Sequence, residues 1–229
     1  SFRAKDSLPL VCTGYMSLLI YSALARVQRN NKVILHHYIF EGSHPHIICT
    51  AKDANQCQAF YGELQKQLTE SIKRLLGLEN LSIWEGRASV IRLPTLDDAM
   101  LKIGYLYANP SNDDIESSID LYPGVSSWES YLCANSLDSC ATSIHPWIRQ
   151  PMVPRLPSRS VTSRQDEGIC RKMLSAASKT HVLHLYPLAW IKHFIKNASA
   201  TEIASIRTGI NDNLRAREAQ NSGRRAASG

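Results

Sequence analysis

The sequence lacks long apolar runs and closely spaced cysteines. None of its 229 residues belongs to an uninterrupted hydrophobic stretch of the roughly 18–20 residues that a membrane-spanning helix needs. Residues 15–25 come nearest, but they are too short and lack the cationic start of a signal peptide. The six cysteines are scattered, and no two have the C-x-x-C spacing of a zinc ribbon or a thioredoxin motif. We therefore expect free thiols, a reducing cytoplasm and no membrane partner.

Helices are predicted where apolar residues recur every three or four positions. They fall at residues 15–28, 54–76, 95–108 and 113–119. Gly77 follows the second helix as a C-cap residue, and Thr95 opens the third as an N-cap residue. Pro110 ends the third helix, because the residue before a proline is pushed out of the helical region.

Strands are predicted where β-branched and aromatic residues are concentrated, at residues 8–12, 30–40, 44–50 and 81–93. Gly42 and Ser43 separate the two central strands and are typical of a tight hairpin turn. This order of strands and helices favours an α+β fold of the ferredoxin-like, split-βαβ type. In such a fold an antiparallel sheet carries helices on one face.

Prolines and charge divide the chain into regions. A first domain is predicted over residues 1–144, a Pro-rich linker over 145–167 and a basic helical extension over 168–229, with a disordered tail from Asn221. Residues 1–145 hold 12 Lys and Arg against 15 Asp and Glu, whereas residues 146–229 hold 14 against 5. A net charge of +9 in the last part suits an arm that follows a polyanion, and equally a solvated tail.

His44 and His46 form the first candidate site. Alternate side chains of a strand share a face, so the two imidazoles project together while Pro45 points the other way. Two neutral ring nitrogens on one face can bind a single divalent ion. Taken alone, such a pair more often marks two ordinary, half-exposed histidines.

Tyr105 is the centre of the second candidate site. At about 100° per residue, Tyr105 and Asn109 lie on one helical face about one turn apart, whereas Tyr107 points roughly 200° away. Lys102 shares the face of Tyr105 and can meet a phosphate. Taken alone, a tyrosine in an amphipathic helix is usually a core residue, and a lysine there usually faces solvent.

Phosphoryl transfer to tyrosine is the chemistry that unites these residues. A phenol with a pKa near about 10 is a poor nucleophile at neutral pH, and a divalent ion beside the phosphate offsets the developing charge. Two imidazoles and an amide oxygen leave open positions that suit Mg²⁺ or Mn²⁺. A covalent phosphotyrosine stores the bond energy, so a DNA strand can be rejoined without ATP.

Three segments carry a family resemblance. They are residues 38–48 (YIFEGSHPHII), residues 83–87 (IWEGR), and residues 105–110 (YLYANP) followed by 122–128 (YPGVSSW). In this order they resemble the histidine hairpin, the tryptophan-containing strand and the nucleophile helix with the domain end of the HUH single-tyrosine transposases, specifically the REP-associated tyrosine transposase-like group. The resemblance covers about residues 8–132, and its third segment is the most specific.

The resemblance implies a role for each matching residue. His44, His46 and Asn109 resemble the metal ligands, and Tyr105 resembles the nucleophile that attacks single-stranded or hairpin DNA. The tyrosine then carries the 5′ phosphate and a 3′ hydroxyl is freed. Where the family has Met-x-Asn before the first histidine, this chain has residues 40–43 (FEGS), and Pro45 replaces a bulky apolar residue. The resemblance also implies a bacterial, nucleoid-associated protein that acts as a monomer or a homodimer.

Basic residues are the expected contacts to DNA phosphates. They are Arg87, Lys102, Arg171, Lys172, Arg215 and Arg217. Trp84 and Trp128 are candidate stacking platforms for splayed bases, or else buried core residues.

Two other functions stay open from the sequence. A domesticated, non-catalytic DNA-binding protein on the same fold would keep the basic arm without needing Tyr105. A histidine-based metallohydrolase unrelated to DNA would explain His44 and His46, but not Tyr105, Asn109 or the charge asymmetry.

Overall fold

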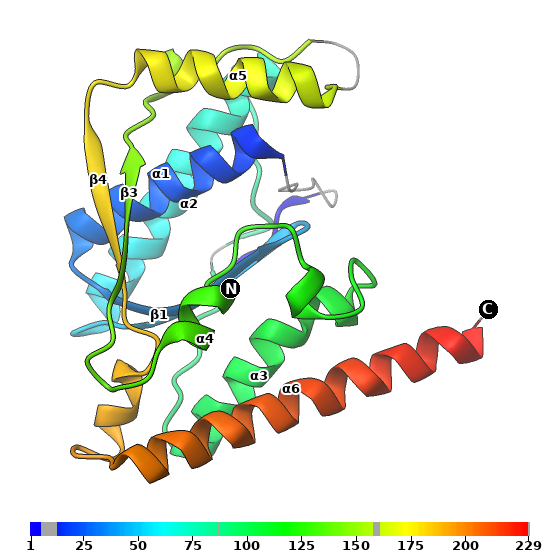
Figure 1. The fold of residues 1–229 in the computed structure, drawn as a ribbon. Coiled ribbons are helices and arrows are strands. Elements are labelled where there is room, and N and C mark those ends of the chain that lie inside the picture. Colours follow the sequence, from blue (N-terminus) through cyan, green and yellow to red (C-terminus); the bar gives the residue numbers. More distant parts are fainter. Residues whose placement is uncertain (6–12, 87, 158–160, 229) are drawn as a thin grey trace.

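The computed structural model describes residues 1–5, 13–86, 88–157 and 161–228 (Figure 1). The helices are α1 (Gly14–Asn31), α2 (Ala54–Leu76), α3 (Leu96–Asn112), α4 (Trp128–Cys133), α5 (Ser163–Ala176) and α6 (Ala200–Ser228). The strands are β1 (Ile34–Glu41), β2 (His44–Thr50), β3 (Ala141–Pro146) and β4 (Thr180–Leu185). Short 3-10 helices are η2 (Ile119–Leu121), η3 (Gln150–Met152) and η4 (Ala189–His193).

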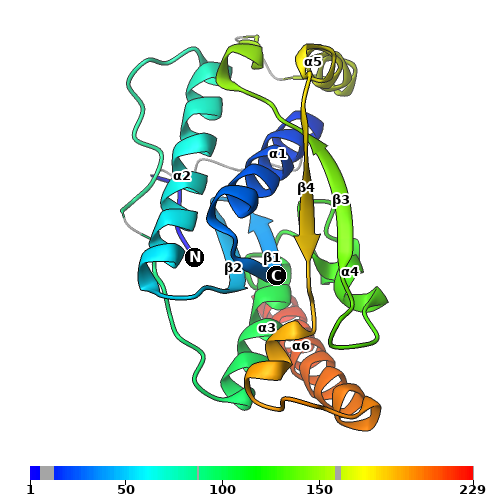
Figure 2. The same ribbon diagram turned by 90° about the vertical axis from the view of Figure 1, so that its left-hand side faces the viewer.

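The described strands form one sheet in the order β2-β1-β4-β3 (Figure 2). β1 pairs with β2 antiparallel, and β3 pairs with β4 antiparallel. β1 and β4 run parallel and pair through Leu35 and Leu185. The predicted α+β class is confirmed. The prediction of an entirely antiparallel sheet is wrong, because β4 returns through α5 alongside β1 in the same direction.

β1 separates two hydrophobic cores. Leu35 and Phe40 belong to a core shared with α1, α2, α5 and β4, whereas Ile39 belongs to a core shared with α3, α4, η4 and α6. Figures 1 and 2 show α1 and α2 on one side of the sheet, and α3 and α6 on the other. The prediction of helices on one face is therefore wrong. Seven of the eight residues of β1 are buried, so both of its faces must be covered.

The histidine hairpin and the caps of two helices agree with the sequence. Gly42 turns the chain between β1 and β2 at a φ of 43°, and Gly77 ends α2 at a φ of 68°. Thr95 opens α3 by accepting a hydrogen bond from the backbone N–H of Asp98 at 3.1 Å.

The predicted end of the third helix is wrong, because α3 runs past Pro110 to Asn112. Proline has no N–H and would leave the carbonyl four residues earlier, that of Leu106, without its helical donor. The Nδ2 atom of Asn109 donates to the Leu106 oxygen at 3.3 Å and takes the place of that donor.

The helix predicted over residues 113–119 is also wrong. Asp114 has a φ of 55°, and only the 3-10 turn η2 forms, from Ile119.

The second half of the chain belongs to the same sheet. The predicted domain boundary after residue 144 falls inside β3, and β4 lies within the region predicted to be a helical extension. The predicted linker packs against the first core, where Ile148 is 7% and Val153 is 1% exposed. The predicted disordered end is helical in the described residues to Ser228, because Asn221 donates to Asn112 and Arg225 pairs with Asp114 at the end of α3.

The first residues of the chain lie beside a segment that was predicted to be a strand. Residues 8–12 lie outside the described residues. Residues 81–86 and 88–93, the described part of another predicted strand, form no strand but include a bridge between Ala4 and Trp84. Residues 1–5 run between this segment and the start of β2. Ala4 donates its N–H to the Ser43 oxygen at 2.7 Å, and Glu85 donates its N–H to the Arg3 oxygen at 3.0 Å. The chain start thus lies beside the histidine hairpin.

Candidate functional site

The hairpin directs both histidines toward α3. His46 lies opposite Ile39 and His44 lies opposite Glu41, so all four share the face of the sheet that α3 covers. Pro45 is tolerated because its partner Phe40 directs its own N–H to the Val125 oxygen, away from β2. A proline at this position therefore costs the sheet no hydrogen bond.

The two imidazoles are neighbours and both favour the neutral form. Their ring centroids lie 5.2 Å apart. Burial lowers the pKa of His46 to about 3, with further lowering by the charges of His44, the N-terminal amine, Lys102 and Arg3. Burial also lowers the pKa of His44, opposed in part by Asp113, whose Oδ2 lies 3.5 Å from His44 Nε2. Neutral imidazoles are the form that binds metal ions.

Tyr105 completes this cluster from α3. Its ring centroid lies 6.2 Å from that of His46. Two cations lie over the ring: Lys102 Nζ at 4.3 Å and the Arg217 guanidinium carbon at 5.6 Å from the centroid. The ring is half-buried and borders a groove of about 440 Å³, which we call the tyrosine groove. Arg92, Lys102 and Arg217 line this groove together with Asp98.

Close packing of α6 on α3 brings Arg217 to the tyrosine. A Cβ atom added at Gly104 would stand 2.6 Å from Asn213 Oδ1 on α6, so a larger residue would displace the Asn213 side chain. Asn213 in turn accepts a hydrogen bond from Arg217 Nε at 2.9 Å. The absence of a side chain at Gly104 therefore leaves room for Asn213, which bonds Arg217 beside the phenol ring.

Tyr107 lies on the other side of α3 and is buried. Its hydroxyl lies 2.9 Å from both His37 Nδ1 and Ser127 Oγ. Ser127 also accepts a hydrogen bond from the Tyr38 N–H at 2.8 Å, which ties the segment before α4 to β1. Ser127 of the predicted motif thus acts in core packing. Tyr107 has no exposed surface, whereas Tyr105 reaches a groove.

Asn109, the predicted third ligand, is buried one turn after Tyr105. It is 1% exposed, and its Nδ2 atom is held by the Leu106 carbonyl. A side-chain amide that donates through nitrogen keeps its oxygen available as an acceptor. Among the described residues, no group of three or more His, Cys, Asp or Glu is arranged to hold a metal ion. The His46 Nε2 atom is buried and has no hydrogen-bond partner in the described part of the chain. His46 thus offers one neutral ring nitrogen, unpartnered among the described residues, beside His44, and this is the donor chemistry that a divalent ion accepts.

The predicted DNA-contacting cations that the structure describes do not form one surface. Lys102 and Arg217 flank Tyr105, as described above. Arg171 and Lys172 are exposed on α5, at the opposite end of the molecule from α6 (Figure 1). Arg87 lies outside the described residues.

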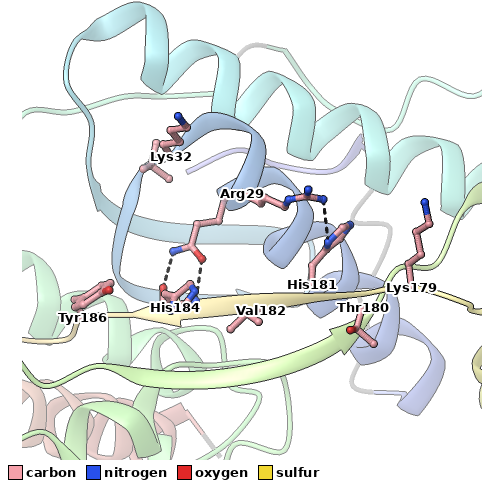
Figure 3. Close-up of a pocket in the computed structure, with 10 residues that line it drawn as sticks. Arg29, Lys32, Lys179, Thr180, His181, Val182, His184 and Tyr186 are labelled. Carbon is pink, nitrogen blue, oxygen red and sulfur yellow. Dashed lines mark hydrogen bonds between the residues drawn. The ribbon is translucent and has the colours of Figure 1, made fainter.

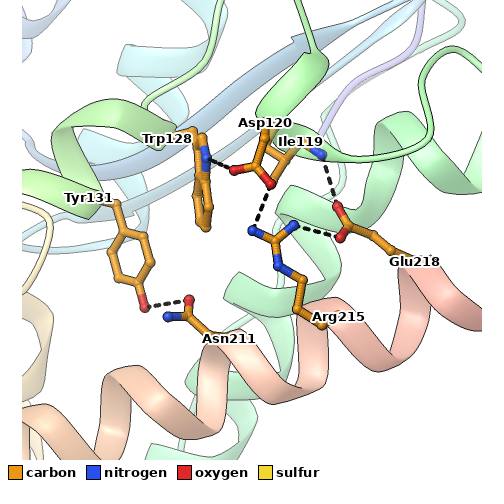
Figure 4. A network of polar contacts seen from close by, with 7 residues as sticks. All are labelled: Ile119, Asp120, Trp128, Tyr131, Asn211, Arg215 and Glu218. Carbon is orange, nitrogen blue, oxygen red and sulfur yellow. Dashed lines mark hydrogen bonds and ion pairs between the residues drawn. The ribbon is translucent and has the colours of Figure 1, made fainter.

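Arg215 takes part in a structural network (Figure 4). It forms ion pairs of 2.7 Å with Asp120 and with Glu218, and Glu218 accepts a hydrogen bond from the Ile119 N–H at 2.8 Å. The Nε1 atom of Trp128 donates to Asp120 at 2.9 Å. Arg215 therefore fastens α6 to the segment that precedes α4.

Neither candidate tryptophan is a free stacking platform. Trp128 is 5% exposed and packs in the second core. Trp84 packs edge-on against Phe2 at 4.7 Å, and its Nε1 atom donates to Thr69 Oγ1 at 2.9 Å. Trp128 is thus a buried core residue, whereas Trp84 is partly buried against the first core.

Sequence reasoning missed several charged neighbours of the histidines. Arg3 and the N-terminal amine come from the chain start, and Asp113 comes from the end of α3. Glu41 lies beside His44 with 0% exposure, and both carboxylate oxygens lack a hydrogen-bond partner among the described residues. Burial, followed by the charge of Asp113, raises the pKa of Glu41 to about 8. The available signal for Glu41 was a single carboxylate at the end of a predicted strand, three positions before His44.

Comparisons with protein-family models, with curated proteins and with solved structures found no match to this chain. Among the described residues, no helix combines the length and the apolar character needed to cross a membrane.

Proposed function

We propose that the chain is a metal-dependent DNA strand transferase of the tyrosine transposase type. It cleaves and rejoins single-stranded or hairpin DNA through a covalent link to Tyr105. One observation carries the proposal: a half-exposed tyrosine borders a groove, with a neutral histidine on one side and two cations over its ring. A core tyrosine such as Tyr107 has no such surroundings.

The proposed reaction exchanges one phosphodiester bond for another. The Tyr105 oxygen attacks the phosphorus and loses its proton, and the bond to the 3′ oxygen breaks. The 3′ oxygen leaves as a hydroxyl, and the 5′ phosphate stays on the tyrosine. In the reverse step, a 3′ hydroxyl attacks the phosphotyrosine and releases Tyr105. No ATP is needed, because each step forms a bond of the same kind as it breaks.

The residues around the tyrosine have separate parts in this reaction. Lys102 and Arg217 supply positive charge, which stabilises a phenolate and the phosphate oxygens that approach it. His44, His46 and the oxygen of Asn109 are the proposed ligands of Mg²⁺ or Mn²⁺. When bound, the ion polarises the phosphate and offsets its charge. The Asp113 carboxylate lies 3.5 Å from His44 Nε2 and helps to orient that imidazole.

The decisive test is a covalent adduct. The protein is incubated with Mn²⁺ and a labelled DNA hairpin that carries a single-stranded flank, and adducts are separated on a denaturing gel. We expect an adduct with the wild type and none with Tyr105→Phe. Tyr61→Phe is the matched control, since it removes the same atom from α2 on the other side of the sheet. An adduct that persists in Tyr105→Phe, or none with the wild type, contradicts the proposal.

The metal ligands are tested in the same assay. We expect His46→Ala and added EDTA each to abolish the adduct while hairpin binding persists, and His145→Ala on β3 to behave as the wild type. Binding of DNA by the wild type without any adduct would instead support the non-catalytic DNA-binding protein.

A further inference from the structure

A second groove lies between the end of α1 and β4 (Figure 3). We call it the α1–β4 groove. Its volume is about 740 Å³. Arg29, Lys32 and Lys179 line it and are all exposed, and no carboxylate is found among its described lining residues.

The groove exists because β4 extends beyond its parallel neighbour. β1 pairs with β4 only at Leu35 and Leu185, so the earlier part of β4 has no strand on that side. Beside His184, the Gln28 side chain takes the place of a neighbouring strand. Its Nε2 atom donates to the His184 oxygen at 2.5 Å, and its Oε1 atom accepts from the His184 N–H at 2.8 Å. The stretch from Thr180 to Val182 then borders the open groove.

His181 fixes one of the groove's cations. The Nη1 atom of Arg29 lies 3.4 Å from His181 Nδ1. Arginine can only donate, so Nδ1 accepts and the ring proton of the neutral imidazole is on Nε2. His181 is 7% exposed, and its Nε2 atom has no hydrogen-bond partner in the described part of the chain. The pKa of His181 is lowered by burial and then by Arg29, Arg26 and Lys179, which agrees with a positive potential here.

Positive charge and an aromatic ring continue beyond the groove. The Arg26 guanidinium lies 4.1 Å from the Trp147 ring centroid, and that of Arg149 lies 5.5 Å from it. The Trp147 and His181 ring centroids are 5.5 Å apart. The cations therefore lie both in the groove and around Trp147 beyond it. Charges at several separate positions fit the repeated phosphates of a polymer better than they fit a single small anion. Alternation of basic and aromatic side chains is typical of surfaces that bind single-stranded nucleic acid.

We propose that the α1–β4 groove binds the phosphodiester backbone of a single-stranded DNA segment, with Arg29, Lys32 and Lys179 as its phosphate contacts. The choice of DNA as the polyanion rests on the function proposed above. The site itself is separate from the tyrosine groove, because α1 and α3 cover opposite faces of the sheet. A hairpin held at Tyr105 thus has its flanking strand bound on the far side of the sheet.

The test measures DNA binding without cleavage, in a Tyr105→Phe background. A fluorescent hairpin with a 20-nucleotide single-stranded flank is titrated by anisotropy at several salt concentrations. The groove variant is Arg29→Gln/Lys32→Gln/Lys179→Gln. The control is Lys52→Gln/Lys66→Gln/Lys196→Gln, which removes the same charge from exposed lysines that do not line this groove. We expect the groove variant to bind at least about tenfold more weakly, with a salt slope smaller by about 2. The control should stay within about threefold of the parent.

Three results overturn the proposal. The first is that the two variants lose DNA affinity equally, and the second is that the groove variant keeps the salt slope of its parent. The third is that polyglutamate, but not unlabelled DNA, binds in the groove in a competition titration. If the groove variant melts at a lower temperature than the control, Lys179→Glu alone replaces it, with the same expected direction. The adduct assay separates the two proposals. An adduct with the wild type but no effect of the groove variant refutes only this site, and a groove effect without any adduct refutes only catalysis.

Discussion

Tyr105 and Tyr107 lie two residues apart on α3, yet their surroundings are opposite. Tyr105 borders a groove beneath Lys102 and Arg217, and Tyr107 is enclosed by aromatic rings and bonded to His37 and Ser127. The same side-chain chemistry is therefore available to a ligand on one side of the helix and is part of the core on the other. The difference teaches that access to a tyrosine hydroxyl on α3 depends on which side of the helix carries it, and each prediction below tests one part of that contrast.

The largest expected effect is on the enclosed side. Tyr107→Ala removes a fully buried ring and leaves His37 and Ser127 without their shared partner. We expect a loss of about 3–5 kcal/mol in the free energy of unfolding, as for other large-to-small core changes. Tyr105→Ala should cost much less, since its ring is half-exposed. Urea denaturation of both variants measures the difference, and equal losses would show that the contrast between the two sides is not real.

The next effect concerns the buried carboxyl group on the hairpin. The pKa of Glu41 is raised to about 8, so between about pH 4.5 and 8 the folded chain keeps a proton that the unfolded chain releases. The contribution of Glu41 to stability should then fall as pH rises through this window, by up to about 1.4 kcal/mol per pH unit. Glu41→Gln cannot ionise and should remove that decline. Melting temperatures from pH 5 to 8.5, in EDTA, compare the two proteins, and parallel curves would contradict the expectation.

A smaller effect is expected where α6 packs on α3. Gly104→Ala places a methyl group against Asn213 and should cost about 1–3 kcal/mol by overpacking. The displacement of Asn213 should also move Arg217 from Tyr105 and reduce adduct formation. Gly168→Ala is the matched control, because its added Cβ meets nothing within 4 Å. Unfolding and adduct yield are measured together, and a stable Gly104→Ala variant with full yield would refute the role of this contact.

The smallest effect separates two arginines of α6. Arg215→Ala breaks ion pairs to Asp120 and Glu218. The Arg215 side chain is partly exposed, so we expect a loss of about 1 kcal/mol in stability. Arg217→Ala should leave stability within about 0.5 kcal/mol and weaken DNA binding instead. Chemical denaturation measures the stability of both variants, and fluorescence anisotropy measures their affinity for the DNA hairpin. The reverse pattern would mean that Arg215 is the one that meets DNA.

Local signals predicted the histidine hairpin and the caps of two helices correctly. Gly42 and Gly77 occupy positive φ angles, and Thr95 caps α3, because these features depend on a few neighbouring residues. The histidine pair was placed on one face by the period of the strand alone. The end of α3 was mispredicted, because Asn109 compensates for the donor that Pro110 lacks.

Long-range pairing was the part that local signals did not reveal. β4 alternates buried and exposed residues, but its six residues were taken for part of a helical extension. Its pairing with β1 joins Leu185 to Leu35 across 150 positions of sequence, and no local pattern encodes such a contact. The same holds for the chain start, which brings Arg3 to His46.

The sequence by itself determined that His44 and His46 share a face, that Tyr105 and Asn109 share another, and that Tyr107 points away from both. These relations follow from the periods of strands and helices, which are fixed by backbone geometry. Only the tertiary structure decided that the two faces meet, that Lys102 and Arg217 flank the phenol, and that Arg215 and the tryptophans are structural. It did so because β1 is buried on both sides, which requires α3 and α6 to cover one face and α1 and α2 the other.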